Sequence, residues 1–295
     1  MGAPRLTRRF VLGGAAALLL PAPLWADDGP SRADLTLSAA DGREVKVRVT
    51  WPKTGSKHNW RRLPLLVFSH GANGTLDGLV PLQNALTRGR IVVAPQHPDS
   101  EANPDLAKVD RKLVLAQRVA DMQLVLDSLP LIERTTGRRV DPRRIAAGGH
   151  SYGALIAQML GGAEISGRSW RDQRISRVLA FSPPGPFPGL AEASGWSKIA
   201  VPQFVLTGTL DVVPPVAATW QAHTVSFDAS PTKGSALWVG RDVDHYFGNH
   251  IQRLSRVAGD QSAAFRQATD LADAFLRGAP LRAVAGTTTE RLVLK

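Results

Sequence analysis

Two contrasting patterns of apolar and polar residues run along the chain. Residues 35–38 and 44–51 alternate apolar and polar side chains on either side of a turn at Asp41 and Gly42, which is typical of an antiparallel hairpin with one face in water. Later apolar runs are short, unbroken and rich in valine, isoleucine and leucine, as in strands buried on both faces of a parallel sheet. These runs are residues 63–68, 91–94, 145–147, 178–181, 204–206 and 236–239.

Helical spacing of apolar residues lies between most of these runs. Leucine, valine and methionine recur every three or four residues over 115–129, before Pro130. Alanine, leucine and phenylalanine do so over 264–275, before Gly278 and Pro280, which should end the helix. The alternation predicts an α/β fold: a mostly parallel, doubly wound sheet with an antiparallel N-terminal edge and helices on both faces. With no repeat and no low-complexity linker, residues 27–295 are expected to form a single catalytic domain.

A G-x-S-x-G pattern provides the strongest chemical signal. Residues 149–153 read Gly-His-Ser-Tyr-Gly and stand between the strand expected at 144–148 and the helix expected at 154–160. A serine on a sharp strand-to-helix turn exposes its hydroxyl, and flanking glycines leave room for strand and helix to approach. We therefore expect Ser151 to be a nucleophile.

A serine nucleophile needs a base, and the base needs an acid to orient it. Asp211 follows one expected strand, and His245 follows the next, so both should lie at the carboxyl edge of the sheet. His223, in a polar segment before a strand, and His250, which we expect to open the last helix, are weaker candidates for the base. Asp242 and Asp244 flank His245 and remain alternatives, either as the acid or as a metal pair.

The oxyanion of the tetrahedral intermediate should be held by two backbone amides. The natural donors are Tyr152, directly after the nucleophile, and Ala72, in the loop after the first parallel strand. His70 in that loop is expected to be structural. Four aromatic residues near the expected cleft are candidates for substrate binding: Tyr246, Phe187, Trp170 and Trp196. For Trp196, packing in the core is the favoured alternative.

With these residues in place, the chain resembles the α/β-hydrolase superfamily, and more narrowly the bacterial esterases similar to dienelactone hydrolase and platelet-activating-factor acetylhydrolase. The resemblance spans most of the expected domain and rests on F-S-H-G-A-N-G (68–74), V-V-A-P-Q-H-P-D-S (92–100), G-G-H-S-Y-G-A (148–154), A-F-S-P-P-G-P (180–186), L-T-G-T-L-D (206–211) and D-H-Y-F-G (244–248). It implies a triad of Ser151, Asp211 and His245, with Ala72 and Tyr152 as oxyanion donors. Dienelactone hydrolases themselves use cysteine, so the serine argues for carboxylic esters generally.

The expected reaction is hydrolysis of short-chain or soluble esters through an acyl-enzyme. An amidase or peptidase with the same triad, and a binding protein without catalysis, remain alternatives. No cofactor or metal is expected, because the chain holds no Walker motif, no G-x-G-x-x-G and no H-E-x-x-H.

The N-terminus predicts export. Arg5, Arg8 and Arg9 precede a ten-residue apolar stretch and a small residue at Ala26, and Thr7 to Leu12 resembles a twin-arginine signal. An ordinary secretory signal or an uncleaved anchor is the alternative. Residues 1–26 would then be a signal peptide and the enzyme periplasmic or secreted, which suits a chain without cysteine.

The rest of the chain stays basic after removal of such a signal, since the charge of +11 loses three arginines and becomes +8. Its lysines and arginines are scattered without interleaved aromatic residues, which favours a solvated surface over a nucleic-acid site. No other apolar run is long enough to span a membrane, so stable membrane insertion is not expected. The expected partner is a small-molecule ester.

Overall fold

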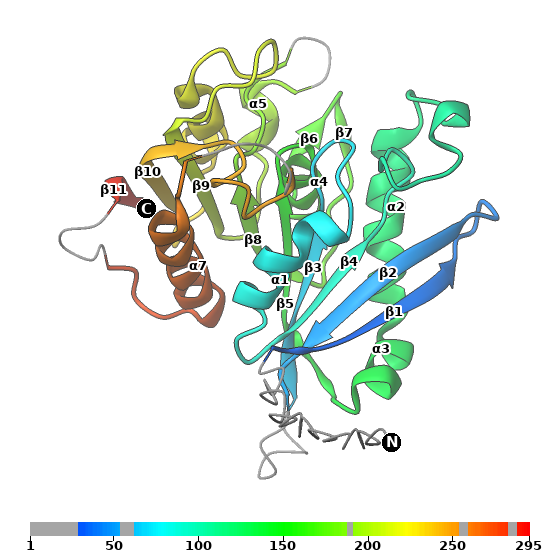
Figure 1. Cartoon of the computed structure of the whole chain (residues 1–295). Coiled ribbons are helices and arrows are strands. Elements are labelled where there is room, and N and C mark those ends of the chain that lie inside the picture. Colours follow the sequence, from blue (N-terminus) through cyan, green and yellow to red (C-terminus); the bar gives the residue numbers. More distant parts are fainter. Residues whose placement is uncertain (1–28, 54–61, 188–190, 254–258, 283–287) are drawn as a thin grey trace, which may run out of the picture.

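Nine strands of the described residues form one mixed sheet in the computed structural model (Figure 1). The structure describes residues 29–53, 62–187, 191–253, 259–282 and 288–295. Across the sheet the strands run in the order β1-β2-β4-β3-β5-β8-β9-β10-β11. Their bounds are β1 (Ser31–Ser38), β2 (Glu44–Trp51), β3 (Leu63–Ser69), β4 (Ile91–Pro95), β5 (Val140–His150), β8 (Ile175–Phe181), β9 (Gln203–Leu210), β10 (Ala236–Asp244) and β11 (Thr289–Leu294).

The predicted arrangement of the sheet is confirmed. Strands β4, β3, β5, β8, β9 and β10 are parallel, and the hairpin β1–β2 joins this block antiparallel through β2 and β4. A second antiparallel edge, formed by β11 against β10, was not predicted. Strand β11 is largely exposed and lacks the unbroken apolar run of the inner strands, so its sequence gives a weaker signal.

Helices cover both faces of the sheet, as predicted (Figure 1). Alternate residues of the inner strands belong to two separate apolar clusters, one on each face. One face packs against α1 (Val80–Leu86) and α7 (Ser262–Arg277). The other face packs against α2 (Val114–Asp127), α3 (Leu129–Thr136), α4 (Tyr152–Leu160), α5 (Ala193–Trp196) and α6 (Val225–Ala229).

Shorter elements connect these layers. They are the hairpin of β6 (Glu164–Ile165) and β7 (Arg168–Ser169), and the 3₁₀ segments η1 (Asp77–Leu79), η2 (Leu106–Lys108) and η3 (Trp220–Thr224). Among the described residues, no helix combines the length and the apolar character needed to cross a bilayer. The expected signal at 1–26 lies outside the described residues.

The helix expected before Pro130 ends where the proline predicts, but another helix begins there. Helix α2 ends at Asp127, and Pro130 occupies the first turn of α3, where its missing N–H has no intrahelical acceptor to lose. The last helix ends as expected at Arg277, because Gly278 takes the left-handed conformation (φ 70°) that favours glycine.

A buried ion pair joins the two helices on one face. The guanidinium of Arg90, just after α1, lies 2.5 Å from the carboxylate of Asp273 on α7 and donates to the carbonyl of Leu86. The side chain of Arg90 is only 2% exposed. A charge in this position is costly once its partner is removed.

We predict that Asp273→Ala lowers the free energy of unfolding by about 3–5 kcal/mol, because it leaves the Arg90 charge buried and unpaired. Asp270→Ala on the same helix is the matched control, since Asp270 pairs with Arg88 at the surface and should contribute about 0–1 kcal/mol. Urea denaturation of both variants measures the difference. Equal losses would contradict the role given to the buried pair.

Candidate active site

Ser151 sits on a sharp turn between β5 and α4. Its backbone has φ 53° and ψ −122°, a conformation that residues other than glycine rarely adopt. The turn is held by a hydrogen bond from the Ser151 amide to the carbonyl of Phe181 on β8. The side chain lines a cavity of about 310 Å³, and its hydroxyl has no hydrogen-bond partner among the described residues. Ser151 is therefore presented to the cavity, as predicted.

The glycines of the motif are required by close packing. A Cβ on Gly149 would overlap the carbonyl oxygen of Gly153, and a Cβ on Gly153 would overlap the carbonyl oxygen of Ser69 at the end of β3. Both positions therefore need glycine so that the first turn of α4 can lie directly against β5 and β3. The spacing of the motif follows from this contact.

Asp211 and His245 form the pair expected of acid and base. Asp211 directly follows β9 and His245 directly follows β10, and His245 Nδ1 lies 2.7 Å from Asp211 Oδ1. Asp211 is fully buried, and its other oxygen accepts a hydrogen bond of 2.7 Å from the hydroxyl of Thr207. Because Nδ1 of His245 faces the carboxylate, Nε2 is left for the cavity that His245 shares with Ser151.

The charge of Asp211 is secured by its neighbours. Burial alone would raise the pKa of Asp211, but His245 and His223 together hold that pKa well below its usual range. Asp211 is therefore an anion throughout the physiological pH range. A permanently charged carboxylate is what a protonated imidazole needs beside it.

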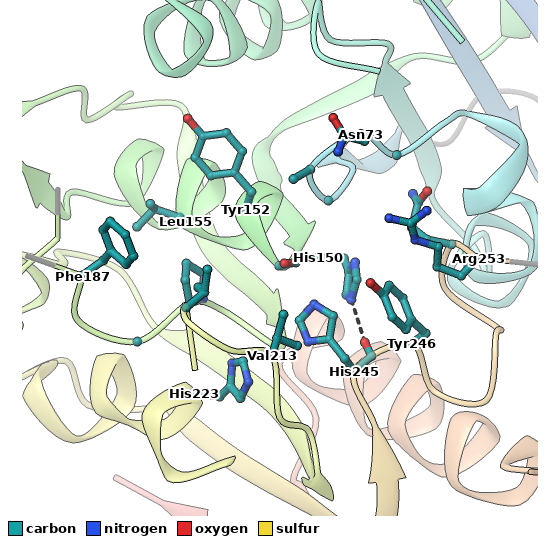
Figure 2. Close-up of a pocket in the computed structure, with 18 of the residues that line it drawn as sticks. Asn73, His150, Tyr152, Leu155, Phe187, Val213, His223, His245, Tyr246 and Arg253 are labelled. Atoms are coloured by element: carbon teal, nitrogen blue, oxygen red, sulfur yellow. Dashed lines mark hydrogen bonds between the residues drawn. The ribbon is translucent and has the colours of Figure 1, made fainter. Parts of the chain in front are cut away.

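His150, the residue before Ser151, supports His245 from the other side. Its Nε2 donates a hydrogen bond of 2.8 Å to the carbonyl oxygen of His245, and the two rings lie 4.8 Å apart between centroids (Figure 2). Burial, followed by the neighbouring His245, lowers the pKa of His150 to about 3. His150 is therefore a neutral donor that holds the backbone of the base.

The two amides predicted to hold an oxyanion both lie at the cavity. Ala72 and Tyr152 line it, and neither of their N–H groups donates to another described residue. The carbonyl of Gly71 accepts a hydrogen bond of 3.0 Å from Arg118. The Gly71 carbonyl and the Ala72 N–H belong to the same trans peptide group, so they point in opposite directions. Because Arg118 binds the carbonyl, the N–H of Ala72 points away from Arg118.

Arg118 is the residue that sequence reasoning missed beneath this loop. It is fully buried on α2, donates through two nitrogens to the carboxylate of Asp99 at 2.8 and 2.9 Å, and donates to the carbonyl of His70 at 2.6 Å. Its guanidinium lies 4.7 Å from the ring centre of Tyr152. One side chain thus joins both halves of the expected oxyanion site. Arg118 lies on the face of α2 that the sequence predicted to be apolar, so the sequence pattern did not indicate that it would bind the loop after β3.

His70 is structural, as expected. Its Nδ1 donates to the carbonyl of Gly71 at 2.7 Å, and its Nε2 accepts from the backbone N–H of His97 at 3.0 Å. Burial and the charge of Arg118 lower the pKa of His70 well below its ordinary value. The neutral ring therefore ties the loop after β3 to the loop after β4.

A second serine, histidine and aspartate lie in line beneath the same loop. His97 Nε2 is 2.8 Å from Ser69 Oγ, and His97 Nδ1 is 2.9 Å from Asp121 Oδ2. None of the three side chains is more than 1% exposed, so no substrate reaches them. This buried triad supports the loop that carries Ala72.

The competing residues have other partners. His250 stacks on Phe265 and bonds to Ser262; it lies twelve residues before α7 begins, so the expectation that it opens this helix was wrong. Asp244 accepts from two backbone amides of its own loop, and Asp242 is exposed on β10. Neither carboxylate contacts His245 in the manner of Asp211.

The four aromatic candidates for substrate binding divide evenly. Tyr246 and Phe187 line the cavity, whereas Trp170 and Trp196 do not. Trp196 is fully buried in the core, where its N–H donates to Gln158, and Trp170 packs beside Arg168 of β7. A tryptophan that is close in sequence to cleft residues can therefore lie away from the cleft in the folded structure.

The cavity has an apolar and a polar end (Figure 2). Figure 2 shows Phe187 and Leu155 to the left of His245, Arg253 to its right and Asn73 above it. Further lining residues that were not predicted are Val213, Val216, Glu101 and Gln252.

His223, which the sequence indicated only as a weaker candidate for the base, lies at the site, because its Nε2 is 2.9 Å from Oδ1 of Asp211. Asp211, His223 and His245 hold atoms of the metal-binding type within 4.8 Å of one another. These atoms face each other, and the remaining nitrogen of His223 bonds to the Pro183 carbonyl. The arrangement is that of an ion-pair cluster, and we find no reason in it to place a metal.

Solved structures share this architecture. A proposed dienelactone hydrolase from Klebsiella pneumoniae subsp. pneumoniae gives a TM-score of 0.59 at 16% identity, covering 82% of this chain and 97% of that one. One of two esterases from the fungus Rhizomucor miehei gives a TM-score of 0.59 at 13% identity, covering 86% and 84%. The chain has the α/β-hydrolase fold. No family model matches the sequence, and no curated protein matches it.

The buried triad of this α/β-hydrolase fold makes stability depend on pH. Burial raises the pKa of Asp121 to about 6, although Arg43 favours its charge. The folded chain then holds a proton that the unfolded chain releases near pH 4. The resulting stability is complete below that pH and is lost as the pH rises through about 6, by about 3 kcal/mol.

We predict that Asp121→Asn removes this decline, so that its free energy of unfolding changes less between pH 4.5 and 7.5 than that of the wild type. Asp41→Asn is the control, because Asp41 binds the same Arg43 but is half exposed and has a lowered pKa. Urea denaturation across this range gives the profiles. Parallel curves for Asp121→Asn and wild type would show that Asp121 is charged throughout.

Proposed function

We propose that the protein is a serine hydrolase that cleaves carboxylic esters, with Ser151 as nucleophile, His245 as base and Asp211 as the orienting acid. The observation that supports this most directly is the shared cavity: Ser151 on its strained turn faces the same space as His245, whose Nδ1 is fixed by a buried carboxylate. Two unpaired amides lie at the same cavity. Acyl transfer through a serine nucleophile needs these features together, and an amidase with the same triad would share them.

The first half of the proposed reaction forms an acyl-enzyme. Nε2 of His245 takes the hydroxyl proton as Oγ of Ser151 attacks the ester carbonyl. Negative charge develops on the carbonyl oxygen, where the amides of Ala72 and Tyr152 donate hydrogen bonds to it. The protonated His245, stabilised by Asp211, then gives its proton to the alcohol, which leaves.

The second half restores the enzyme. A water molecule attacks the acyl group on Ser151 while His245 accepts one of its protons. The tetrahedral intermediate uses the same two amides. Its collapse releases the acid, and the proton returns from His245 to Oγ of Ser151, so that one water is consumed for each ester cleaved.

The size of the cavity supports a short-chain or soluble ester. A volume of about 310 Å³ is at the lower end for small-molecule sites. Phe187 and Leu155 offer apolar contacts at one end, suited to a short acyl or alkyl group. We further propose that the enzyme acts outside the cytoplasm, on the strength of Arg8 and Arg9 before the apolar N-terminal stretch.

We predict that Ser151→Ala lowers ester turnover by several orders of magnitude and abolishes labelling by a fluorophosphonate, while circular dichroism shows an unchanged fold. Ser69→Ala is the matched control, because Ser69 also faces a histidine paired with an aspartate but is buried. Its variant should keep the label. Labelling that persists in Ser151→Ala would sink the assignment of the nucleophile.

Esters and amides can be separated with paired substrates. We predict that p-nitrophenyl acetate and butyrate are hydrolysed much faster than the matching anilides, because an amide carbonyl is less electrophilic than an ester carbonyl. They should also be hydrolysed faster than long-chain esters, because the cavity has a volume of only about 310 Å³. Initial rates with the wild type give the comparison. Rapid anilide cleavage with negligible ester cleavage would instead identify an amidase, and a folded protein that neither turns over nor labels would be a binding protein.

A further inference from the structure

Asp211 serves two histidines, although a serine triad needs only one. Oδ1 of Asp211 lies 2.7 Å from Nδ1 of His245 and 2.9 Å from Nε2 of His223. His223 is 1% exposed, belongs to η3 in the connection between β9 and β10, and lines the cavity beside His245 (Figure 2). The same carboxylate oxygen is therefore shared between two imidazoles.

The contacts of His223 favour its charged form. Its Nδ1 lies 2.6 Å from the carbonyl oxygen of Pro183, and because a carbonyl only accepts, Nδ1 carries a proton. Nε2 is not aligned with Asp211 as a hydrogen bond, so that contact acts through charge. A neutral ring would set a lone pair near the carboxylate, whereas a second proton makes the contact attractive. Although burial opposes the charge, Asp211 and Pro183 raise the pKa of His223 above its ordinary value.

The groups that face His223 come from three elements. Asp211 follows β9, His245 follows β10 with its ring centroid 5.7 Å from that of His223, and His150 ends β5. Asp228 of α6 is turned to the hydroxyl of Thr224 instead. Asp211 is thus the anion that faces three imidazoles, of which His150 stays neutral. Any positive charge on His223 or His245 is therefore stabilised by the same carboxylate, that of Asp211.

We propose that His223 is a positioning residue that shares the carboxylate of Asp211 with His245 and thereby sets the pH range in which His245 acts as base. The inference rests on the proposed function. A cationic His223 competes with protonated His245 for the same oxygen, and the two like charges repel. We therefore expect the reaction to persist to a lower pH beside a cationic His223 than it would beside Asp211 alone. His223 cannot replace it, because both nitrogens of His223 already face protein acceptors.

The first test is the pH profile of kcat/KM, measured with p-nitrophenyl acetate, and of the rate of fluorophosphonate labelling. In His223→Gln and His223→Phe, we expect the acid limb to move about one to two pH units upward, the size given by two charges about 6 Å apart at an effective dielectric constant near 20. At a pH well below the midpoints of both profiles, kcat/KM of the variants should be about 10- to 100-fold lower than that of the wild type. The change in kcat/KM on the plateau of the profile should be smaller.

His250→Gln is the control, because His250 lies outside the cavity and should leave the acid limb in place. The glutamine variant keeps a donor for the Pro183 carbonyl and guards against a folding defect in the phenylalanine variant. If His223→Gln folds and loses activity equally at every pH, with an unmoved acid limb, His223 has only a structural role and the proposal is overturned.

A second measurement does not depend on the reaction. In an NMR titration of the wild type, we expect the imidazole of His223 to stay protonated above the ordinary midpoint of about 6.5, and to lose this in Asp211→Asn. The signal is assigned by its absence from His223→Gln. An imidazole that is neutral at pH 6 overturns the inference even in an active esterase. A wild type that shows the high midpoint but neither turnover nor labelling means instead that the proposed function has failed.

Discussion

The site depends on the contact between the nucleophile turn and the end of β3. Gly149 and Gly153 have no side chains, so the turn around Ser151 lies against the backbone of Ser69 with no space between them. This contact brings the first turn of α4 next to the loop that carries Ala72. The proposed amide donors and the proposed nucleophile therefore follow neighbouring strands of one parallel block, and close backbone packing fixes their relative position.

Buried charged side chains then orient the loop that carries Ala72 and the imidazole of His245. Arg118 pairs with Asp99 and binds the carbonyls of the oxyanion loop, and Asp211 pairs with His245. Each charge has lost its water and is held by several protein groups, which makes the arrangement stiff and costly to disturb. A chain with a high positive charge thus uses the buried Arg118 to hold this loop, separately from the arginines scattered over its surface.

The sequence was most informative where the role of a residue depends only on its neighbours in the chain. Apolar runs predicted every inner strand, strand ends predicted that Asp211 and His245 would lie at one edge of the sheet, and the glycine spacing predicted the turn at Ser151. The contacts of His223 and Arg118 could not be predicted in this way, because each depends on elements far apart in sequence. Trp196 shows the same limit, since its segment lies near the cleft along the chain but its indole packs into the core.

Two sets of serine, histidine and aspartate occur in this chain, and the backbone at the serine separates them. Ser69 is the last residue of an extended strand, so its side chain points into the interior, where His97 and Asp121 meet it. Ser151 has a positive φ, so its side chain leaves the strand direction and enters the cavity. The same three side-chain types therefore support a loop in one place and meet at the cavity in the other. What distinguishes them is a backbone conformation that the flanking glycines permit, and this is why the glycine pattern predicts chemistry better than the catalytic residue types do.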